Sequence, residues 1–531
     1  MSAVPNRAAH LGDFTLRPRV LLITAIAFGI GAASAGAAWT LLHLIGLVTN
    51  LVFYQRVAFG LVSPADAHAP PWLVLLAPVA GGLVVGLMAR FGSEKIRGHG
   101  MPEAIEAILV GGSRVSPRVA VLKPVSAAIS IGSGGPFGAE GPIIMTGGAV
   151  GSILAQLLKL SADERKTLLV AGAAGGMAAT FNAPLASVLL AVELLLFEWR
   201  PRSLIPVAAA VSVSTVCRGW LLGGNPVFPV SATVHPGALP TALTVVVGLT
   251  GGVLAIGATA LVYLAEDTFA KLRLHWMWWP MIGGAVIGLG GLFEPRALGV
   301  GYDVIDTLLT GRATMGLIVG ILTVKTLIWA LSLGSGTSGG VLAPVFMIGG
   351  ALGALEGMVL PQVFPGFWAL AGLAAVVGGV MRSPLTGVVF TLELTHAWSD
   401  LLPLLIASVS AYLVSALVLK RSVLTEKIAR RGLHLTREYS TDPLETFFAH
   451  EVMTEGAGRP AEGETVVFPE NTLREVANIF AEHSITEAPV VDPAEPGRTL
   501  GVITLDQLLH ARRHDLEEER RRERLLPAAT G

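Results

Sequence analysis

The chain has 531 residues, of which 52% are hydrophobic and only 14% charged, and its mean hydropathy of +0.66 lies well above that of soluble globular proteins. The formal net charge of −1 excludes nucleic acid as a partner, because no basic face large enough to neutralise a phosphate backbone can be assembled. The single cysteine, Cys217, provides neither a disulfide framework nor a metal cluster. The composition therefore indicates an integral membrane protein, for which we expect no metal site.

Apolar stretches long enough to span hydrocarbon recur between Arg19 and about Leu419, separated by short breaks that carry Gly, Pro or charged residues. They predict a series of transmembrane helices, and the period-2 alternation of a membrane β-barrel is absent. The N-terminal segment 1–19 is polar and leads into a long apolar run without a small-residue cleavage site. We therefore expect no signal peptide, and a first helix that remains in the mature, multi-pass protein.

An internal repeat is the most informative feature of the apolar body. KPVSAAISIGSGGPFGAEGPIIMTGGAVG (123–151) recurs as KTLIWALSLGSGTSGGVLAPVFMIGGALG (325–353) at an offset of 202. NAPLASVLLAVEL (182–194) matches RSPLTGVVFTLEL (382–394), and GHGMPEAIEAIL (98–109) matches GVGYDVIDTLL (299–309) more loosely. The repeat predicts two homologous halves of a membrane transport domain, residues 20–222 and 239–421.

Glycine runs and prolines fall inside these apolar segments, where they leave backbone groups unpaired unless the segments line a cavity or are buried in protein. Interrupted helices of internally repeated transporters point free N–H groups and a positive dipole end at an anion. The acidic residues of the body are few and scattered, which disfavours cation coordination. We therefore predict broken helices around an anion, whereas the alternative is that the glycines only allow close helix packing.

Three motifs, GHGMPE (98–103), GAEGP (138–142) and GSG…GVLAP (334–344), resemble those of the CLC family of chloride channels and proton-coupled chloride transporters. FNAPLA (181–186) and PLTG (384–387) extend the resemblance over nearly the whole membrane body. The resemblance implies an all-α polytopic fold with two inverted-topology halves. It also implies a homodimer in which each subunit holds its own chloride pathway.

Glu140 is the first candidate for a functional residue. A carboxylate at a glycine-flanked helix start inside the membrane is costly unless it is used, although it also stabilises a helix dipole. The resemblance implies that Glu140 is the gate, which occupies an anion site when deprotonated and swings out when protonated. Its repeat mate is Leu342, so only one half carries the carboxylate.

Backbone amides are expected to coordinate most of the anion, since such donors tolerate changes of side chain. The resemblance places them in two groups. The outer group consists of Ala139, Glu140 and Gly141, and the central group consists of Val341 and Leu342.

The chain departs from the family pattern at two positions near the central anion. His99 replaces a serine whose hydroxyl contacts the anion, and its ring can donate through either nitrogen. The alternative is a solvent-facing histidine at the intracellular mouth that touches nothing. Leu424 replaces a pore-facing tyrosine, so the central site has lost a donor or borrows the hydroxyl of Thr425.

A third departure concerns proton transfer. Proton-coupled members of the family usually carry an inner glutamate where this chain has Leu194, while Glu193 and its mate Glu393 are expected to be structural. A proton that crosses a low-dielectric region needs titratable stations or water. We therefore predict a passive chloride channel or uncoupled transporter gated by Glu140. The alternative is a chloride/proton antiporter with a non-standard path through water or His99.

The composition becomes that of a soluble protein near Lys420, which predicts a pore-proximal helix and linker (422–445), a small module (446–512) and a charged tail (513–531). The module reads as strand, helix, strand, strand and helix, and resembles one CBS motif. Such motifs work in pairs around a nucleotide, which implies pairing within a homodimer and adenine nucleotide contacts at Thr504 and Asp506. A purely structural dimer contact is the alternative.

The basic run Lys420–Arg431 places the module in the cytoplasm, and the use of Ala, Gly and Arg hints at a bacterial inner membrane. A transporter for another solute would need polar pockets, which these glycine-rich segments lack. A membrane enzyme would need a catalytic constellation, and the histidines of the body are not spaced with acids or cysteine. We therefore expect no enzyme, and chloride as the ligand, although nitrate or bromide would suit backbone donors almost as well.

Overall fold

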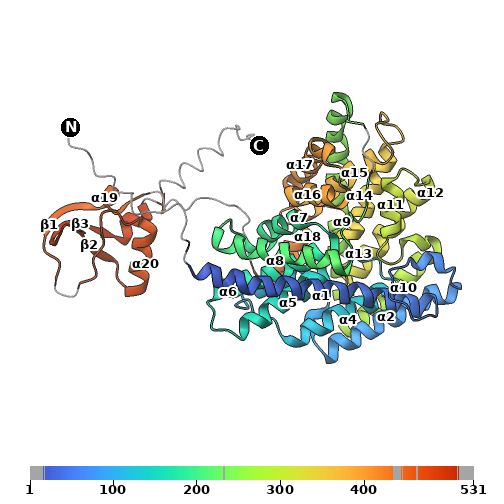
Figure 1. Ribbon diagram of the computed structural model, residues 1–531, viewed down its shortest axis with the longest axis horizontal. Coiled ribbons are helices and arrows are strands. Elements are labelled where there is room, and N and C mark those ends of the chain that lie inside the picture. The colour runs from blue at the N-terminus through green and yellow to red at the C-terminus, as the bar shows by residue number, and fades with distance from the viewer. Residues whose placement is uncertain are drawn as a thin grey trace. The chain divides into compact units, whose positions relative to one another are not determined.

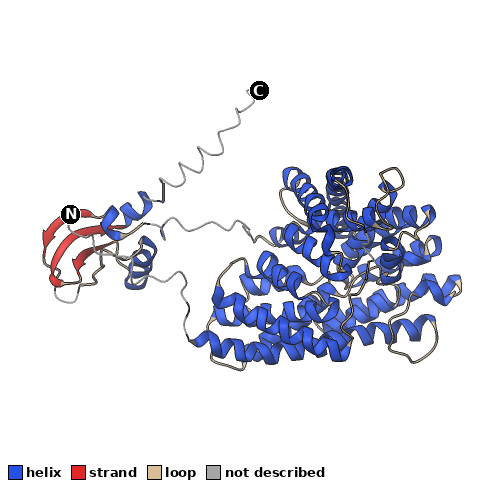
Figure 2. Ribbon diagram, turned by 45° about the horizontal axis from the view of Figure 1, so that its top comes forward, coloured by secondary structure: helices blue, strands red, loops and turns tan. Residues whose placement is uncertain are grey.

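The computed structural model describes residues 16, 18–230, 234–433, 444, 447–461, 464–510 and 512–513 (Figure 1). The described residues before 434 form one compact unit, and those from 444 onward form a second. The first unit is helical throughout and the second contains all the strands of the described residues (Figure 2). Most of the predicted N-terminal segment and of the charged tail, 1–15 and 514–531, lies outside the described residues.

The first half of the membrane unit ends with α8 and contains a π-helical turn, η3, directly after α7. Its elements are α1 (Arg19–Phe53), η1 (Pro64–Ala67), α2 (Pro71–Phe91), η2 (Glu94–Ile96), α3 (Met101–Leu109), α4 (Pro117–Gly132), α5 (Glu140–Gln156), α6 (Ala162–Phe181), α7 (Pro184–Leu190), η3 (Ala191–Leu196) and α8 (Pro201–Leu221).

The second half repeats this order, and α18 follows it. Its elements are α9 (Ala238–Lys271), η4 (Trp276–Trp278), α10 (Trp279–Phe293), η5 (Pro295–Ala297), α11 (Tyr302–Leu309), α12 (Met315–Gly320), η6 (Ile321–Lys325), α13 (Thr326–Gly334), α14 (Leu342–Glu356), α15 (Phe367–Met381), α16 (Pro384–Thr395), η7 (Trp398–Asp400), α17 (Leu401–Val418) and α18 (Val423–Arg430).

Equivalent helices pack in equivalent ways in the two halves. Helix α1 packs on α8 as α9 packs on α17, and α5 packs on α6 as α14 packs on α15. The halves meet through pairs of mates, because α2 packs against α10 and α7 against α16. Such pairing of like with like requires a local two-fold axis, so the prediction of two homologous halves is confirmed.

Backbone hydrogen bonds repeat the same symmetry at the centre of the unit. The N–H of Gly138 donates to the carbonyl of Gly340 at 3.3 Å, and the N–H of Gly340 donates back to Gly138 at 2.7 Å. This antiparallel pair lies directly before α5 and α14, so the two helices begin side by side and their chains run in opposite directions. The two most similar segments of the repeat are therefore brought together.

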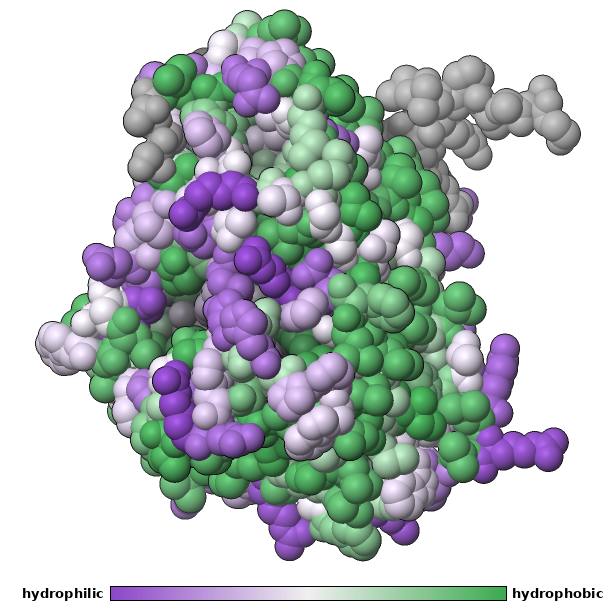
Figure 3. Space-filling model, turned by 90° about the vertical axis from the view of Figure 1, so that its right-hand side faces the viewer, coloured by the Kyte–Doolittle hydropathy of each residue, from purple (hydrophilic) through white to green (hydrophobic). Residues whose placement is uncertain are grey.

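Seven helical stretches of the described residues are long and apolar enough to cross a membrane: Arg19–Phe53, Pro71–Phe91, Pro201–Leu221, Ala238–Lys271, Trp276–Phe293, Met315–Gly334 and Trp398–Arg430. Shorter apolar helices, among them α14, α15 and α16, lie between them. On the face shown in Figure 3, hydrophilic side chains gather in the middle, between broad hydrophobic areas. The protein is therefore an integral multi-pass membrane protein with broken helices in its interior.

Two of the breaks need glycine for their backbone conformation. Gly100 precedes α3 with φ +87°, and its counterpart Gly301 precedes α11 with φ +80°. This left-handed region is open to glycine and costly for other residues. The two turns hold the loops before α3 and α11 in one shape, which matters because His99 lies in the first of them.

The second unit is a small α/β module. Its described elements are α19 (Ala449–Val452), β1 (Thr454–Gly458), α20 (Leu473–His483), β2 (Glu487–Asp492), β3 (Glu495–Thr504) and a helical segment at 505–510. The three antiparallel strands have the order β1-β3-β2, and α20 packs its apolar face into a separate small core with Val467, Val490 and Ile503. The predicted order of strand, helix, strand, strand and helix is confirmed.

Candidate functional site

The Glu140 side chain lies where α5 and α14 begin. It is the first residue of α5 and only 2% exposed. Its Oε1 accepts a hydrogen bond from the N–H of Ala343 at 3.1 Å, and the N–H groups of Leu342 and of Glu140 itself also face the carboxyl group. Because the first N–H groups of a helix have no partner within that helix, the carboxylate occupies a place that would suit an anion.

Two glycines make room for this carboxyl group. A methyl group added at Gly138 or at Gly340 would collide with the Glu140 carboxyl oxygens. These are the same glycines that form the reciprocal backbone pair between the halves. The symmetric centre of the repeat therefore holds one asymmetric carboxylate, with Leu342 as its buried repeat mate.

His99 lies next to this centre. Its carbonyl oxygen packs so closely on Gly141 that any side chain at position 141 would collide with it. The histidine is 4% exposed, and its buried Nδ1 has no hydrogen-bond partner among the described residues. The alternative of a solvent-facing histidine is therefore wrong, and the ring keeps a nitrogen available for a ligand.

The turn that carries His99 is held by a buried lysine that sequence reasoning missed. The Nζ of Lys123 donates to the carbonyls of Ile96 at 2.8 Å and Gly98 at 2.7 Å, and contacts Ser338 Oγ at 3.1 Å. In the second half, Lys325 donates to Ala297 at 2.8 Å and Gly299 at 2.9 Å. Both copies of the repeat begin with these lysines. A charge shared by the two copies of an otherwise apolar segment was the feature of the sequence that could have indicated their structural role.

The central donors predicted at Val341 and Leu342 are buried and form the first turn of α14. Leu424, in α18, is fully buried, and α18 packs against α3. The hydroxyl of Thr425 is bonded within α18: it accepts from the N–H of Ser422 at 3.0 Å while Ser422 Oγ accepts from the N–H of Thr425. Thr425 therefore caps its own helix through this oxygen, and the two alternatives, a lost donor at the central site or a donor borrowed from Thr425, both stay predictions.

Leu194 is fully buried in the π-helical turn η3, and its neighbour Glu193 faces the other half. The Glu193 carboxylate accepts from the N–H of Thr386 at 3.1 Å and from its hydroxyl. Glu393 accepts in the same way from the N–H groups of Leu185 at 2.9 Å and Ala186 at 2.8 Å. Each glutamate thus caps a helix of the opposite half, which is a structural role for both.

We expect Glu393→Gln to lower the free energy of unfolding by about 1–3 kcal/mol, because a charged acceptor of two backbone N–H groups is replaced by a neutral one. We expect Glu193→Gln to lower the free energy of unfolding by a similar amount, because Glu193 accepts from the first turn of α16 as Glu393 accepts from the first turn of α7. Thermal unfolding in detergent measures the loss, and flux assays compare the chloride-to-proton ratio. A changed ratio at unchanged stability would place either glutamate in the transport path instead.

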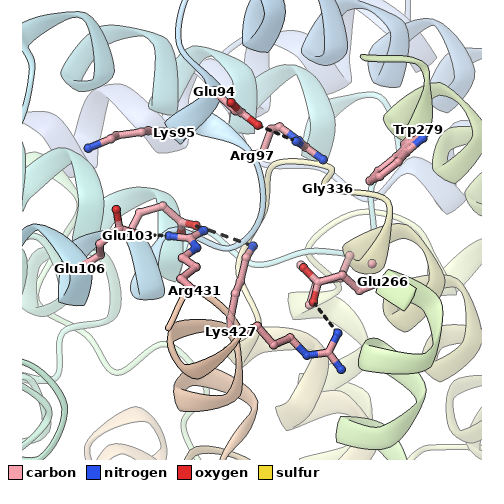
Figure 4. A pocket seen from close by; sticks show the side chains of 13 residues that line it. Glu94, Lys95, Arg97, Glu103, Glu106, Glu266, Trp279, Gly336, Lys427 and Arg431 are labelled. Atoms are coloured by element: carbon pink, nitrogen blue, oxygen red, sulfur yellow. Dashed lines mark hydrogen bonds and ion pairs between the residues drawn. The ribbon is translucent and has the colours of Figure 1, made fainter. Parts of the chain in front are cut away.

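A cavity of about 510 Å³ lies at the loops before α3 and α14 (Figure 4). Several of its lining charges are paired: Glu103 contacts Arg431 at 2.7 Å and Lys427 at 3.7 Å, and Arg431 also binds Glu106. The cavity is lined by Glu94, Lys95, Arg97, Glu103, Glu106, Glu266, Trp279, Leu333, Gly334, Gly336, Lys427, Arg430 and Arg431. These residues come from η2, α3, α9, α10, α13, the end of α18 and the loops before α3 and α14. The loop that carries His99 therefore lines the cavity through Arg97, whereas His99 itself is buried behind it.

In the second unit, Thr504 and Asp506 lie where β3 ends and the 505–510 helix begins. The N–H of Thr504 donates to Gln507 Oε1 at 2.8 Å, and Thr504 Oγ1 accepts from the N–H of Gln507 at 3.4 Å. Asp506 is exposed. Thr504 therefore caps the helix, and a nucleotide at these two residues stays a prediction. Among the described residues, no group of three or more His, Cys, Asp or Glu is arranged to hold a metal ion.

The broken helices, the paired helix starts and the buried carboxylate between them define a transport protein for small anions, built from two related halves. The sequence profile described as "Voltage gated chloride channel" matches residues 80–416, and that described as "CBS domain" matches residues 450–514. The chain therefore belongs to the voltage-gated chloride channel family, the CLC family.

Two relatives and one solved structure illustrate the family. The chain is 30% identical over 423 residues to the H(+)/Cl(-) exchange transporter ClcA of Citrobacter koseri, and the match covers 75% of this chain and 86% of the relative. It is 32% identical over 406 residues to the H(+)/Cl(-) exchange transporter ClcA of Vibrio campbellii, and the match covers 71% of this chain and 85% of the relative. The crystal structure of a slow cyanobacterial Cl-/H+ antiporter matches 78% of this chain and 99% of its own, with a TM-score of 0.67 and 21% identity, so it confirms the fold.

Proposed function

We propose that the protein exchanges chloride for protons across a bacterial inner membrane, with Glu140 as both the gate and the proton carrier. The observation that carries the proposal is the position of the Glu140 carboxylate on the first turn of α14, hydrogen-bonded to the N–H of Ala343. An anion that binds there must displace the carboxylate, and a proton that neutralises the carboxylate favours its release. Competition of this kind links the two ions at one place.

Burial around the gate supports exchange over open conduction. Glu140, His99, Val341 and Leu342 are each at most 5% exposed, so the cavity does not continue as an open aqueous pore through this point. A site that is closed where its gate is seated suits alternate exposure to the two sides. The two relatives named above are H(+)/Cl(-) exchange transporters, which agrees with this form of transport.

Passive chloride flux is the second candidate, and Leu194 favours it. The residue is fully buried and apolar, so the position at which proton-coupled members of the family usually carry a glutamate offers no titratable station here. Under the exchange proposal, protons reach Glu140 through water in the emptied pathway or through His99. Under the passive alternative, Glu140 gates chloride and carries no protons across.

We expect His99→Ala to raise the half-saturating chloride concentration about fivefold, which corresponds to ~1 kcal/mol for one lost neutral hydrogen bond. The buried, unpartnered Nδ1 motivates this expectation. His99→Ser keeps a donor and is expected to stay near the wild-type value. Chloride flux measured against chloride concentration gives both numbers, and an Ala variant with wild-type half-saturation would show that the ring does not touch the anion.

The test of the proposed function is chloride efflux from proteoliposomes of purified protein, with external pH recorded under a clamped membrane potential. Exchange requires that protons enter as chloride leaves, against a proton gradient if one is imposed. Chloride efflux without proton movement would replace exchange by passive flux. The absence of both fluxes, at a protein density confirmed by reconstitution, would remove chloride transport itself.

We further propose that the protein is a homodimer and that its small C-terminal module lies on the cytoplasmic side of the membrane. Its support is that the described residues hold one β-α-β-β-α unit, whereas such units work in pairs, and that basic residues of α18 precede it. Two copies would then form a pair between subunits, with an adenine nucleotide at Thr504 and Asp506 as the candidate ligand.

A further inference from the structure

We propose that the hydroxyl group of Tyr302 receives the Glu140 carboxyl group when the gate is released, and that Tyr302 is thereby a positioning residue for the gate. This inference rests on the proposed role of Glu140 as the gate. The contact of the carboxyl group with the N–H of Ala343 holds its seated form. A released carboxyl group in a buried place needs another polar partner.

Tyr302 lies on the opposite face of the membrane unit from the cavity at α18. It is the first residue of α11 and lines a second cavity, of about 110 Å³, together with residues 61–64 of the loop between α1 and α2. The loop before α3, which lines the first cavity, follows α2 in the chain. Because α2 is long and apolar enough to cross the membrane, the two cavities lie on opposite sides of it.

The hydroxyl group of Tyr302 and one oxygen of Glu140 are both buried without a hydrogen-bond partner. The Tyr302 side chain is partly exposed, but its hydroxyl oxygen is buried and has no partner among the described residues. The same holds for Glu140 Oε2, whereas Oε1 accepts from the N–H of Ala343. Unpaired buried polar atoms are costly. A hydrogen bond from the Tyr302 O–H to Oε2, formed when the carboxyl group turns away from α14, would satisfy both.

Glu140 carries the charge that acts most strongly on the Tyr302 hydroxyl group, and the Arg218 guanidinium of α8 carries the second. Asp303 is the next residue of α11, but its side chain is exposed. Of the two helices that pack most closely against α11, α14 has Glu356 as its last residue, and α15 has no titratable residue along its described length. Glu140 is therefore the carboxyl group that the hydroxyl can receive.

The remaining charges near the start of α11 are engaged or lie at the far end of their helix. The Nζ of Lys325 donates to the carbonyls of Ala297 and Gly299. Helix α6 contacts Tyr302 through Phe181, its last residue, and carries its charged residues, 163–166, in its first turns. Protonation of Glu140 is therefore the change of charge that reaches this hydroxyl group.

Tyr302 belongs to a cluster of five aromatic rings that begins on α14, the helix that holds the seated carboxyl group. The Tyr302 ring centroid lies 5.5 Å from that of Phe228 and 6.5 Å from that of Phe181, both edge to face. Phe181 in turn contacts Phe390 at 5.2 Å, and Phe390 stacks on Phe346 of α14 at 5.3 Å. Phenylalanine offers no hydroxyl group, so Tyr302 supplies the polar group of this cluster.

The variant that tests the proposal is Tyr302→Phe, which removes the hydroxyl oxygen and keeps the ring. Without this oxygen the released, protonated carboxyl group loses a hydrogen bond, so the seated form is favoured. We expect the pH of half-maximal chloride flux in proteoliposomes to fall by about 0.7 unit, a roughly fivefold change in the release equilibrium. Tyr412→Phe, which removes an exposed hydroxyl group of α17, is the control and should keep the wild-type pH profile.

A structural effect of the lost hydroxyl group is separated from an effect on the gate by Glu140→Ala, which leaves no carboxyl group to receive. In that background we expect Tyr302→Phe to leave chloride flux unchanged at every pH, because the two side chains act as a coupled pair. An equal loss of flux in both backgrounds would overturn the proposal. An unshifted pH profile of Tyr302→Phe would overturn it as well.

Crystals of the wild type, grown below the pH of half-maximal flux, give the direct readout. We expect a released Glu140 carboxyl group within about 3 Å of the Tyr302 hydroxyl oxygen. A released carboxyl group bonded elsewhere would overturn the proposal. Chloride flux without proton movement would overturn exchange but not this inference, because a passive gate held by Tyr302 shows the same shift of its pH profile.

Discussion

We expect Glu140→Gln to abolish proton coupling and to make chloride flux independent of pH. In the wild type, chloride flux should rise as the pH falls, because protonation of the carboxyl group releases it from the N–H of Ala343. Glutamine has nearly the same size and mimics the permanently protonated form. The gate then loses both its charge and its ability to carry a proton, so chloride passes while proton movement falls to background.

The measurement is chloride and proton flux from the same proteoliposomes over a range of pH. A suitable control is Asp303→Asn, because Asp303 also lies in the first turn of a half helix, α11, but its side chain is exposed. The control should keep the wild-type pH profile. An unchanged pH profile in Glu140→Gln would remove Glu140 as the gate.

The second large effect is expected at Lys123. Lys123→Met removes a buried donor from the carbonyls of Ile96 and Gly98 and from Ser338 Oγ. Buried acceptors left without a partner cost roughly 1–3 kcal/mol each, so we expect a loss of about 3 kcal/mol or more in the free energy of unfolding. Because the Gly98 turn carries His99, the half-saturating chloride concentration should also rise.

Lys325→Met provides the matched control for this prediction. Lys325 holds the equivalent turn of the second half, where Val300 stands in place of His99. It should lose comparable stability, measured by thermal unfolding in detergent, without a comparable change in chloride affinity per folded protein. If both variants keep wild-type stability, the two lysines do not clamp the turns as their contacts indicate.

The sequence was sufficient for the large-scale architecture. The offset of 202 between the two glycine-rich segments predicts two halves, and the reciprocal bonds of Gly138 and Gly340 show why those segments resemble each other most. They meet at the symmetry axis, where backbone approaches backbone and side chains must be small. Glu140 was predictable from the sequence because it is a single carboxylate within this run of glycines and other small residues.

Contacts between distant segments were harder to predict. Thr425 looked like a spare hydroxyl, but the position of Ser422 three residues earlier makes it part of a helix cap. The exposure of His99 could not be judged, because its burial depends on Gly141 and on the fold of the other half. The contact between the Arg97 guanidinium and the ring of Trp276 gave no signal, since the two residues lie almost 180 positions apart in the sequence.

The most direct test of the central claim is the membrane voltage at which net chloride flux vanishes, measured at a fixed chloride gradient while the pH gradient is varied. If Glu140 couples the two ions, this voltage must shift with the pH gradient in the wild type and stay fixed in Glu140→Gln. A wild-type voltage that stays at the chloride equilibrium potential for every pH gradient would contradict the account and establish passive chloride flux.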